Sequence, residues 1–376
     1  MTTDCPPAPL RIAFYAPLKS PRHPVPSGDR LMARLLFAAL ERAGHEVTLV
    51  SELRAFLRDP GDRAAHDALI ADAAAERARI AALWARAGAP DAFFCYHPYY
   101  KSPDLIGPPL ARAAGIPWIS AEASVSARRD RGLWQGTQDA MRAALAGAAV
   151  NLCLTRRDLA GLRAALPDAR LAPLAPFIAL PVPPAVTGAR AATRIVTVAM
   201  MRAGDKLDSY RALAETLRRL PAGCDWQLSV AGDGPARDAV RALFADLPPA
   251  RIDWRGELDA AAVARLLQEG AVYLWPGCGE AYGLAYLEAQ AAGLPVVAWA
   301  TAGVPEVVAA GETGILTAEG DHDGLAQAVA RLLGDADLRE RMGAAAQARV
   351  RAHHALPAAA ARLDALLRQA VAGAVA

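Results

Sequence analysis

Short apolar runs alternate with longer segments of helical period along the whole chain. In the first half the pattern predicts a helix over 29–43 and strands over 10–16, 46–51, 91–96, 117–120 and 149–154. In the second half it predicts strands over 195–199, 227–231, 271–275 and 295–298. Strands that alternate with helices in this way are typical of parallel sheets with crossover helices. We therefore expect two doubly wound α/β domains.

The domain boundaries follow from length and from proline content. A chain of 376 residues exceeds the size at which one hydrophobic core usually stops growing. The proline-rich stretch 167–184 is interpreted as a linker. We place an N-terminal domain at 1–185 and a C-terminal domain at 186–350, and we expect the Ala-rich segment 351–376 to be a helix that packs back on the first domain.

Composition narrows the classes of function. Lys and Arg number 41 against 39 Asp and Glu, without blocks of like charge, so nucleic acid is not expected as a partner. No run approaches the roughly 20 apolar residues that span a bilayer, and no basic start with an apolar run opens the chain. The five cysteines are scattered singly. We expect a cytoplasmic protein with reduced cysteines and no transmembrane segment.

Residues 280–288, Glu-Ala-Tyr-Gly-Leu-Ala-Tyr-Leu-Glu, follow a predicted strand and open a predicted helix. Gly283 lets backbone N–H groups at the positive end of that helix approach a diphosphate. Glu288 lies about one turn further in, where a carboxylate can accept hydrogen bonds from both hydroxyls of a ribose. Glu280, in the loop, is placed to meet a sugar beyond the phosphates. The plain alternative is two acids at a helix surface.

Two cations follow the strand at 195–199. Arg202 and Lys206 lie four residues apart, and such a pair can clamp a pyrophosphate and neutralise the charge it gains when a sugar departs. Lysine occurs only at 19, 101 and 206 in a chain that otherwise uses arginine, which favours a specific role for Lys206. An ion cluster with Asp205 is the structural alternative.

Four motifs in the second half resemble the donor domain of family 4 glycosyltransferases. They are the Arg202/Lys206 pair, Ala-Gly232-Asp-Gly234-Pro, the glutamates 280 and 288, and Gly303-Val-Pro-Glu306. The similarity covers about 195–324, and it extends more loosely to Gly28 and 44–47. It implies the α/β GT-B fold, with two Rossmann-like domains facing across a cleft. It also implies retaining transfer of a sugar from a UDP- or GDP-linked donor, without a metal or a resident cofactor.

The resemblance assigns roles to the donor-side residues. Arg202 and Lys206 would hold the departing diphosphate, and the leaving phosphate would take the acceptor's proton. Glu280 would bind hydroxyls of the donor sugar, and Glu288 would bind the ribose. The backbone N–H groups of Gly283 and Leu284 would bind the phosphates.

The N-terminal half carries fewer of the family's residues. Gly28 would bring a loop close to the same phosphates, and His97 would contact the sugar, although a buried histidine can also satisfy a polar group of the core. Where the family often has a second histidine, this chain has Glu122. The acceptor side therefore departs from the pattern.

Several alternatives stay open on sequence alone. A nucleotide-sugar epimerase, a phosphorylase of the same fold, and a non-catalytic nucleotide-sugar-binding homologue share these motifs. A carbohydrate, a lipid-linked or a small-molecule acceptor fits, with polysaccharide biosynthesis at the inner face of a membrane as one setting. The arginines of 126–134 offer peripheral contact with an anionic acceptor or membrane, or form a solvated loop. Asp321 and Asp323 resemble a metal pair, but Asp is also expected as the cap of the following helix.

Overall fold

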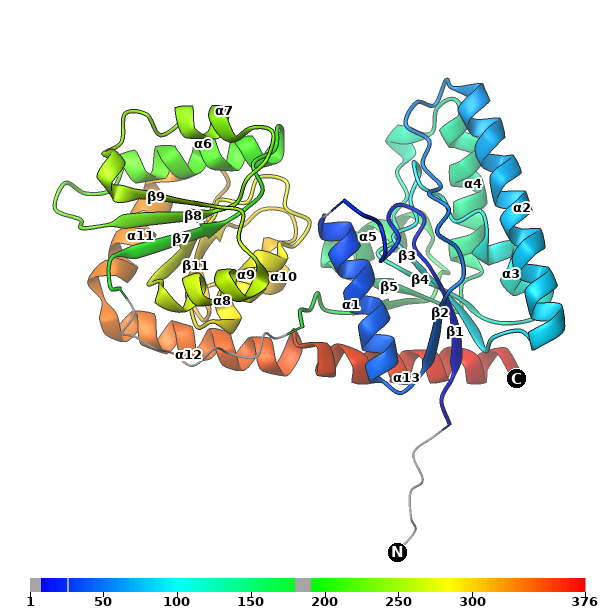
Figure 1. Cartoon of the computed structure of the whole chain (residues 1–376). Helices are drawn as coiled ribbons and strands as arrows, with labels where there is room; N and C mark the ends of the chain where they lie inside the picture. Colours follow the sequence, from blue (N-terminus) through cyan, green and yellow to red (C-terminus); the bar gives the residue numbers. More distant parts are fainter. Residues whose placement is uncertain (1–7, 26, 180–190, 376) are drawn as a thin grey trace, which may run out of the picture. The chain divides into compact units, whose positions relative to one another are not determined.

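The computed structural model describes residues 8–25, 27–179 and 191–375, which divide into two units. The first unit is Met1–Ala175 together with Leu356–Ala376, and the second is Pro176–Ala355. The division falls after Ala175 and Ala355, whereas the sequence placed it after 185 and 350. The C-terminal helix clusters with the N-terminal unit. Each unit is built on one sheet, and each is described by itself below (Figure 1).

The first unit contains a six-stranded parallel sheet in the order β2-β1-β3-β4-β5-β6. Its strands are β1 (Arg11–Tyr15), β2 (Glu46–Leu49), β3 (Ala92–Tyr96), β4 (Trp118–Ala121), β5 (Val150–Cys153) and β6 (Leu171–Pro173). Its helices are α1 (Gly28–Arg42), α2 (Arg63–Ala87), α3 (Gly107–Ala114), α4 (Leu133–Ala146), α5 (Arg156–Ala165) and α13 (Leu356–Val375).

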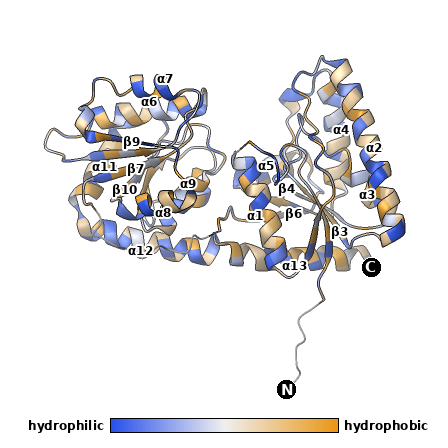
Figure 2. Cartoon of the chain, viewed as in Figure 1, coloured by the Kyte–Doolittle hydropathy of each residue, from blue (hydrophilic) through white to orange (hydrophobic). Residues whose placement is uncertain are grey.

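The central strands of this sheet are buried on both faces. Every residue of β3, β4 and β5 is buried, which is why these strands are mainly apolar. Their polar residues Ser120 and Asn151 hydrogen-bond to each other at 2.7 Å. Helix α1 buries one face and exposes the other, and its hydrophobic and hydrophilic residues alternate accordingly (Figure 2). Helix α13 packs against α1, and His45 Nε2 lies 3.2 Å from Asp364 Oδ1 on α13. The last helix is therefore part of this unit's core.

The second unit contains a six-stranded parallel sheet in the order β12-β11-β10-β7-β8-β9. Its strands are β7 (Arg194–Val198), β8 (Gln227–Ala231), β9 (Ile252–Gly256), β10 (Val272–Leu274), β11 (Val296–Trp299) and β12 (Gly314–Thr317). Its helices are α6 (Asp205–Arg218), α7 (Arg237–Ala242), α8 (Ala260–Glu269), α9 (Leu284–Ala291), α10 (Val304–Val307), α11 (His322–Gly334) and α12 (Ala336–His353). Counted within the unit this order is 3-2-1-4-5-6 reversed, that of dinucleotide-binding domains.

The prediction of two doubly wound α/β domains is confirmed, with local corrections. The linker expected at 167–184 is wrong in part, because β6 lies within it and pairs with β5; 180–184 lie outside the described residues. At the end of α12, His354 is buried, and its Nδ1 contacts the carbonyl oxygen of Pro176 at 2.7 Å. Lys206, which follows the strand at 195–199 as expected, lies in the first turn of α6.

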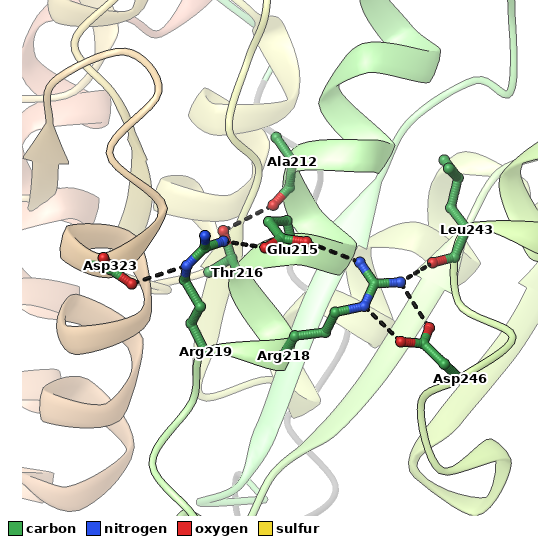
Figure 3. A network of polar contacts seen from close by, with 8 residues as sticks. All are labelled: Ala212, Glu215, Thr216, Arg218, Arg219, Leu243, Asp246 and Asp323. Atoms are coloured by element: carbon green, nitrogen blue, oxygen red, sulfur yellow. Dashed lines mark hydrogen bonds and ion pairs between the residues drawn. The ribbon is translucent and has the colours of Figure 1, made fainter.

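An arginine network ties two helices of the second unit together away from the carboxyl ends of the strands (Figure 3). Arg218 on α6 donates two hydrogen bonds of 2.7 Å to the carboxylate of Asp246. Its neighbour Arg219 pairs with Glu215 and, at 2.9 Å, with Asp323 on α11. The arginine beside it lowers the pKa of Asp246 to about 2. This network is structural. It gives Asp323, which the sequence also offered as half of a metal pair, an arginine partner.

Candidate functional site

The candidate donor site lies where the strand order of the second unit reverses. The sheet runs outward from β7 in one direction and from β10 in the other, and ligands of open α/β sheets bind beyond the strand ends at such a point. Arg202 lies exposed in the loop after β7, and Lys206 follows at the start of α6. Glu280 lies in the loop after β10. The fold therefore brings together Lys206 and Glu280, which are 74 residues apart in sequence.

Lys206 and Glu280 meet directly. The ammonium of Lys206 pairs with Glu280 Oε1, and the same oxygen accepts a hydrogen bond of 3.0 Å from Nε1 of Trp275. The ammonium also lies 5.5 Å from the centre of the Trp275 ring, within cation–π range. The alternative pairing of Lys206 with Asp205 is not what the structure shows. Lys206 instead pairs with Glu280, and both side chains contact the indole of Trp275.

Trp275 is held from two sides. Its ring packs edge-on against Tyr210 of α6 with centroids 4.9 Å apart, and its carbonyl accepts a 3.0 Å hydrogen bond from the hydroxyl of Tyr286. The side chain is buried. A buried indole without rotamer freedom gives the Glu280 carboxylate a fixed direction, which is how a surrounding layer orients a functional group.

The N-terminus of α9 offers backbone donors. Gly283 is its N-cap, with φ 73° and no side-chain cap, and a Cβ there would lie 2.5 Å from the Tyr286 ring. Only glycine adopts this conformation without strain beside that ring. No side chain therefore caps the first N–H groups of the helix, which begin at Leu284. They point out of the N-terminal end of the helix, where an anion is favoured.

Glu288 lies one turn into α9 and is partly buried. Burial disfavours its charged form and raises its pKa to about 7. The carboxylate therefore changes charge close to neutral pH. A group of this kind beside an uncapped helix N-terminus is a candidate ligand contact on physical grounds.

Close backbone packing brings neighbouring loops to the same edge. A Cβ at Gly232 would lie 1.9 Å from the carbonyl oxygen of Ala199, and a Cβ at Gly303 would lie 1.6 Å from that of Ala281. The amide of Met201 also donates to the carbonyl of Asp233 at 2.9 Å. The glycine motifs after β8 and β11 thus let the loops carrying Arg202 and Glu280 pack tightly.

The first unit has its own cluster at its switch point, between β1 and β3. His97 follows β3, and its Nδ1 lies 3.2 Å from Oδ1 of Asp29 in the first turn of α1. Glu122 follows β4 and accepts a 2.9 Å hydrogen bond from the hydroxyl of Tyr96. His97 and Glu122 have φ of 57° and 55°, a conformation that costs non-glycine residues energy and is often retained at functional sites.

The charges of this cluster support one another. Burial opposes a charge on His97, but Asp29 and the field of Glu122 outweigh it and raise its pKa. Burial likewise raises the pKa of Glu122, while the positive charge of His97 acts against that shift. The contact with His97 overcomes burial at Asp29 and lowers its pKa. The imidazole is therefore favoured in its protonated form.

Gly28 is the first residue of α1, next to Asp29. A Cβ at Gly28 would meet nothing within 4 Å among the described residues, so its surroundings do not by themselves require glycine. Asp29 and Trp275 were missed in the sequence, although Asp29 stands directly after Gly28 and Trp275 directly follows β10. Only the tertiary contacts identify them.

Asp321 and Asp323, which the sequence also offered as a metal pair, both have partners within the second unit. Asp321 is the N-cap of α11 and accepts a 2.8 Å hydrogen bond from the amide of Gly324, as the capping interpretation expected. In the described part of the chain, no group of three or more His, Cys, Asp or Glu is arranged to hold a metal ion.

The second unit matches a known family. Residues 192–335 match the family model "Glycosyl transferases group 1". These residues form a group 1 glycosyltransferase domain. The domain contains Arg202, Lys206, Glu280 and Glu288, and the resemblance expected over about 195–324 is confirmed within it.

Among curated proteins, the chain is 31% identical over 142 residues to the sulfoquinovosyl transferase SQD2 of Arabidopsis thaliana, covering 37% of this chain. The match spans 27% of the length of that relative. It thus supports the group 1 glycosyltransferase domain over part of each chain.

Solved structures cover nearly the whole chain. A sucrose-phosphate synthase from Thermosynechococcus elongatus has a TM-score of 0.72 at 21% identity, over 97% of this chain and all of that one. The Anabaena protein HepE in complex with UDP has a TM-score of 0.72 at 14% identity, over 96% of this chain and all of that one. The GT-B fold is therefore confirmed beyond the group 1 glycosyltransferase domain.

Proposed function

We propose that this protein is a retaining, metal-independent glycosyltransferase that moves a sugar from a nucleotide diphosphate sugar to an acceptor. The observation that carries the proposal is the Lys206–Glu280 pair around Trp275, at the switch point of a dinucleotide-type sheet. A cation and a carboxylate there meet the two unlike parts of a nucleotide sugar, the anionic pyrophosphate and the hydroxylated sugar. The UDP in the related HepE structure favours a UDP-linked donor, and a GDP-linked donor is the second candidate.

The pyrophosphate is assigned to Arg202, Lys206 and the start of α9. On binding, Lys206 exchanges its contact with Glu280 for the phosphates, and Arg202 approaches from the loop after β7. The amides of Gly283 and Leu284 bind the phosphate next to them. These donors stabilise the negative charge that grows on the diphosphate as the anomeric bond breaks. No Lewis acid is required in this scheme.

The sugar and the ribose are assigned to the two glutamates. Glu280 keeps the hydrogen bond from Trp275 on one oxygen and offers the other to hydroxyls of the donor sugar. Glu288 accepts hydrogen bonds from the ribose, and ionised Glu288 is the form that can accept two of them.

The N-terminal unit is assigned to the acceptor side. His97, protonated and held by Asp29, donates a hydrogen bond to the sugar, and Gly28 leaves room for phosphate beside the start of α1. The acceptor's proton passes to the leaving phosphate, so no protein base is required. A carbohydrate or lipid-linked acceptor, in the cytoplasm or at the inner face of a membrane, fits this assignment. No described helix is long and apolar enough to span a membrane.

Release of free nucleoside diphosphate from nucleotide sugars tests the proposal. The native chain is expected to release it from one donor, at a rate raised by the correct acceptor, and Lys206→Ala is expected to lose about 100-fold or more in kcat. Arg211→Ala, on the same helix and exposed, is the matched control. Binding of the nucleotide without turnover would instead support a non-catalytic homologue. Interconversion or phosphorolysis would support an epimerase or a phosphorylase.

A further inference from the structure

A set of basic and aromatic side chains gathers beyond the carboxyl ends of the first unit's strands. We call it the cation–aromatic patch and define it as Arg54, Lys101, Arg129, Arg131, Tyr100 and Trp134. Its residues come from the segments that follow β2, β3 and β4. These segments lie at the edge of a parallel sheet where ligands bind.

Three of the four cations of the patch lie over its rings, whereas Arg54 lies 4.5 Å from the centre of the Phe56 ring. Lys101 Nζ is 5.4 Å from the centre of the Trp134 ring and 5.8 Å from that of Tyr100. The guanidinium of Arg131 is 5.5 Å from Trp134, and that of Arg129 is 5.7 Å from Tyr100. Cations over ring faces are held in place while their N–H groups stay available to a ligand.

The three segments are fixed to one another. The amide of Leu57 donates to the carbonyl of Lys101 at 2.8 Å, and Nε1 of Trp134 donates to the carbonyl of Leu57 at 3.0 Å. The amide of Leu133 donates to the carbonyl of Pro60 at 2.9 Å. The patch is therefore held by main-chain hydrogen bonds around a buried indole, unlike a solvated loop of independent side chains.

The positive charge of the patch is uncompensated. Within the described residues, none of Arg54, Lys101, Arg129 and Arg131 forms an ion pair, and the three arginines are exposed. Asp130 lies between two of them in sequence, but it pairs with Arg142 at 2.5 Å.

The carboxylates of the neighbouring loop are also engaged elsewhere. Asp59 accepts from the amide of Gly61, and Asp62 caps α2 through the amide of Ala65. Four cations without a carboxylate partner produce a local positive potential in a chain whose net charge is only +2.

Aromatic rings connect the patch to His97. The rings of His97 and Tyr99 are 5.2 Å apart, those of Tyr99 and Tyr100 are 5.3 Å apart, and those of Tyr100 and Trp134 are 4.9 Å apart. The candidate sugar contact and the cations are thus the two ends of one continuous row. Such a row suits an acceptor with an apolar or sugar body and an anionic end.

We propose that the acceptor carries a phosphate ester, and that the cation–aromatic patch binds that phosphate. The inference rests on the proposed function and names its acceptor class. Arginine forks bind two phosphate oxygens at once, and Lys101 adds a point charge between the rings. A neutral acceptor would leave four cations without a counterion.

The test measures phosphate binding in the absence of any donor. Glucose 6-phosphate is compared with glucose by calorimetry, and phosphatidylglycerol vesicles are compared with phosphatidylcholine vesicles by sedimentation. The variant is Arg129→Gln with Arg131→Gln. The control is Arg86→Gln with Arg341→Gln, which removes the same charge from exposed positions on α2 and α12.

The native chain is expected to bind the phosphate-bearing probe of at least one pair, and the Arg129/Arg131 variant is expected to bind it at least 10-fold more weakly, with the control unchanged. Binding of glucose 6-phosphate identifies a soluble phosphate ester, and binding of phosphatidylglycerol vesicles alone identifies a lipid headgroup. Equal binding of charged and neutral probes, or equal loss in both variants, would overturn the inference.

Nucleotide binding by the second unit is measured on the same samples. If nucleotides bind and phosphate esters do not, only this inference fails. If nucleotides do not bind the native chain, the proposed function fails on its own evidence.

Discussion

At the residue scale, the candidate donor site depends on how Glu280 is oriented. Three groups converge on it: the ammonium of Lys206, Nε1 of Trp275, and the loop held by the amide of Gly303, which donates to the Glu280 carbonyl at 3.3 Å. Lys206 is assigned to leave for the phosphates when a donor binds. Trp275 then remains to hold the Glu280 carboxylate in its orientation.

Trp275 is therefore expected to act as a positioning residue. Trp275→Phe keeps an aromatic ring under Lys206 and removes the N–H, and a hydrogen bond to a charged group is worth about 1.5–3 kcal/mol. We expect kcat to fall about 10- to 100-fold while affinity for the free nucleoside diphosphate is unchanged. Steady-state kinetics with Trp226→Phe, another buried indole of the same unit, as control checks this. Unchanged kcat would show that the indole has no part in orienting Glu280.

Glu288 gives the donor site a pH dependence. Its pKa is raised to about 7 by burial, and its ionised form is the one that accepts two ribose hydroxyls. Affinity for a nucleotide sugar, whose pyrophosphate does not titrate in this range, is therefore expected to rise as pH increases through about 7. Calorimetric titrations from pH 6 to 8 measure it. A flat profile, or the same rise in Glu288→Gln, would exclude Glu288 as the titrating group.

Burial of Glu288 has the opposite effect on stability. Because the folded pKa lies above the value of 4.5 usual for glutamate, the native state holds this proton more tightly than the unfolded chain does. Its contribution to stability is full below about 4.5 and is lost as pH rises to about 7. Binding and stability thus respond to pH with opposite signs, which distinguishes a ligand contact from a purely structural acid.

At the element scale, the sequence predicted the buried strands and one edge strand, β2, and it missed the other three edge strands. The strands β6, β9 and β12, which it did not predict, are all edge strands. β6 has three residues and ends at a proline, and β9 alternates between partly buried and exposed positions. Edge strands need neither length nor continuous hydrophobicity, so periodicity does not reveal strands as short or as exposed as these three. The buried strands, apolar on both faces, were visible for the opposite reason.

The loops between these elements depend on close backbone packing. Gly232 has φ 147°, and a Cβ there would lie 1.9 Å from the carbonyl oxygen of Ala199. Gly232→Ala is therefore expected to lower the free energy of unfolding by about 1–3 kcal/mol and to displace the loop carrying Arg202. Urea denaturation measures the first effect and nucleotide binding the second.

Gly334→Ala provides the comparison for that substitution. Its Cβ meets nothing within 4 Å among the described residues, at the end of α11, so stability should stay equal or rise by up to about 1 kcal/mol. If Gly232→Ala were as stable as Gly334→Ala, the loops after β7 and β8 could move apart without loss of stability.

At the scale of the whole molecule, fold and candidate site were predictable to different degrees. The alternation of strands and helices predicted two doubly wound domains, and spacing with family resemblance singled out Arg202, Lys206, Glu280 and Glu288. The pairing of Lys206 with Glu280, and that of Asp29 with His97, join residues far apart in sequence. Periodicity reports local structure only, so such pairs emerge from the folded chain.

Each unit has one proposed binding function: the second holds the nucleotide sugar, and the first receives the acceptor. Nucleotide binding and acceptor binding can be tested separately, because Glu288, which is proposed to bind the ribose, lies in the second unit. The central claim is the nucleotide site of the group 1 glycosyltransferase domain.

The most direct test is a thermal-shift series with UDP, GDP, ADP and dTDP on the native chain, Glu288→Ala and Glu312→Ala. Glu312 lies exposed in a turn before β12 and serves as the matched control. One nucleotide at 100 times its Kd is expected to raise the free energy of unfolding of the native chain and of the control by about 2.7 kcal/mol. Glu288→Ala is expected to lose most of this increase. No stabilisation by any of the four at millimolar concentration, or equal stabilisation of all three proteins, would contradict this prediction.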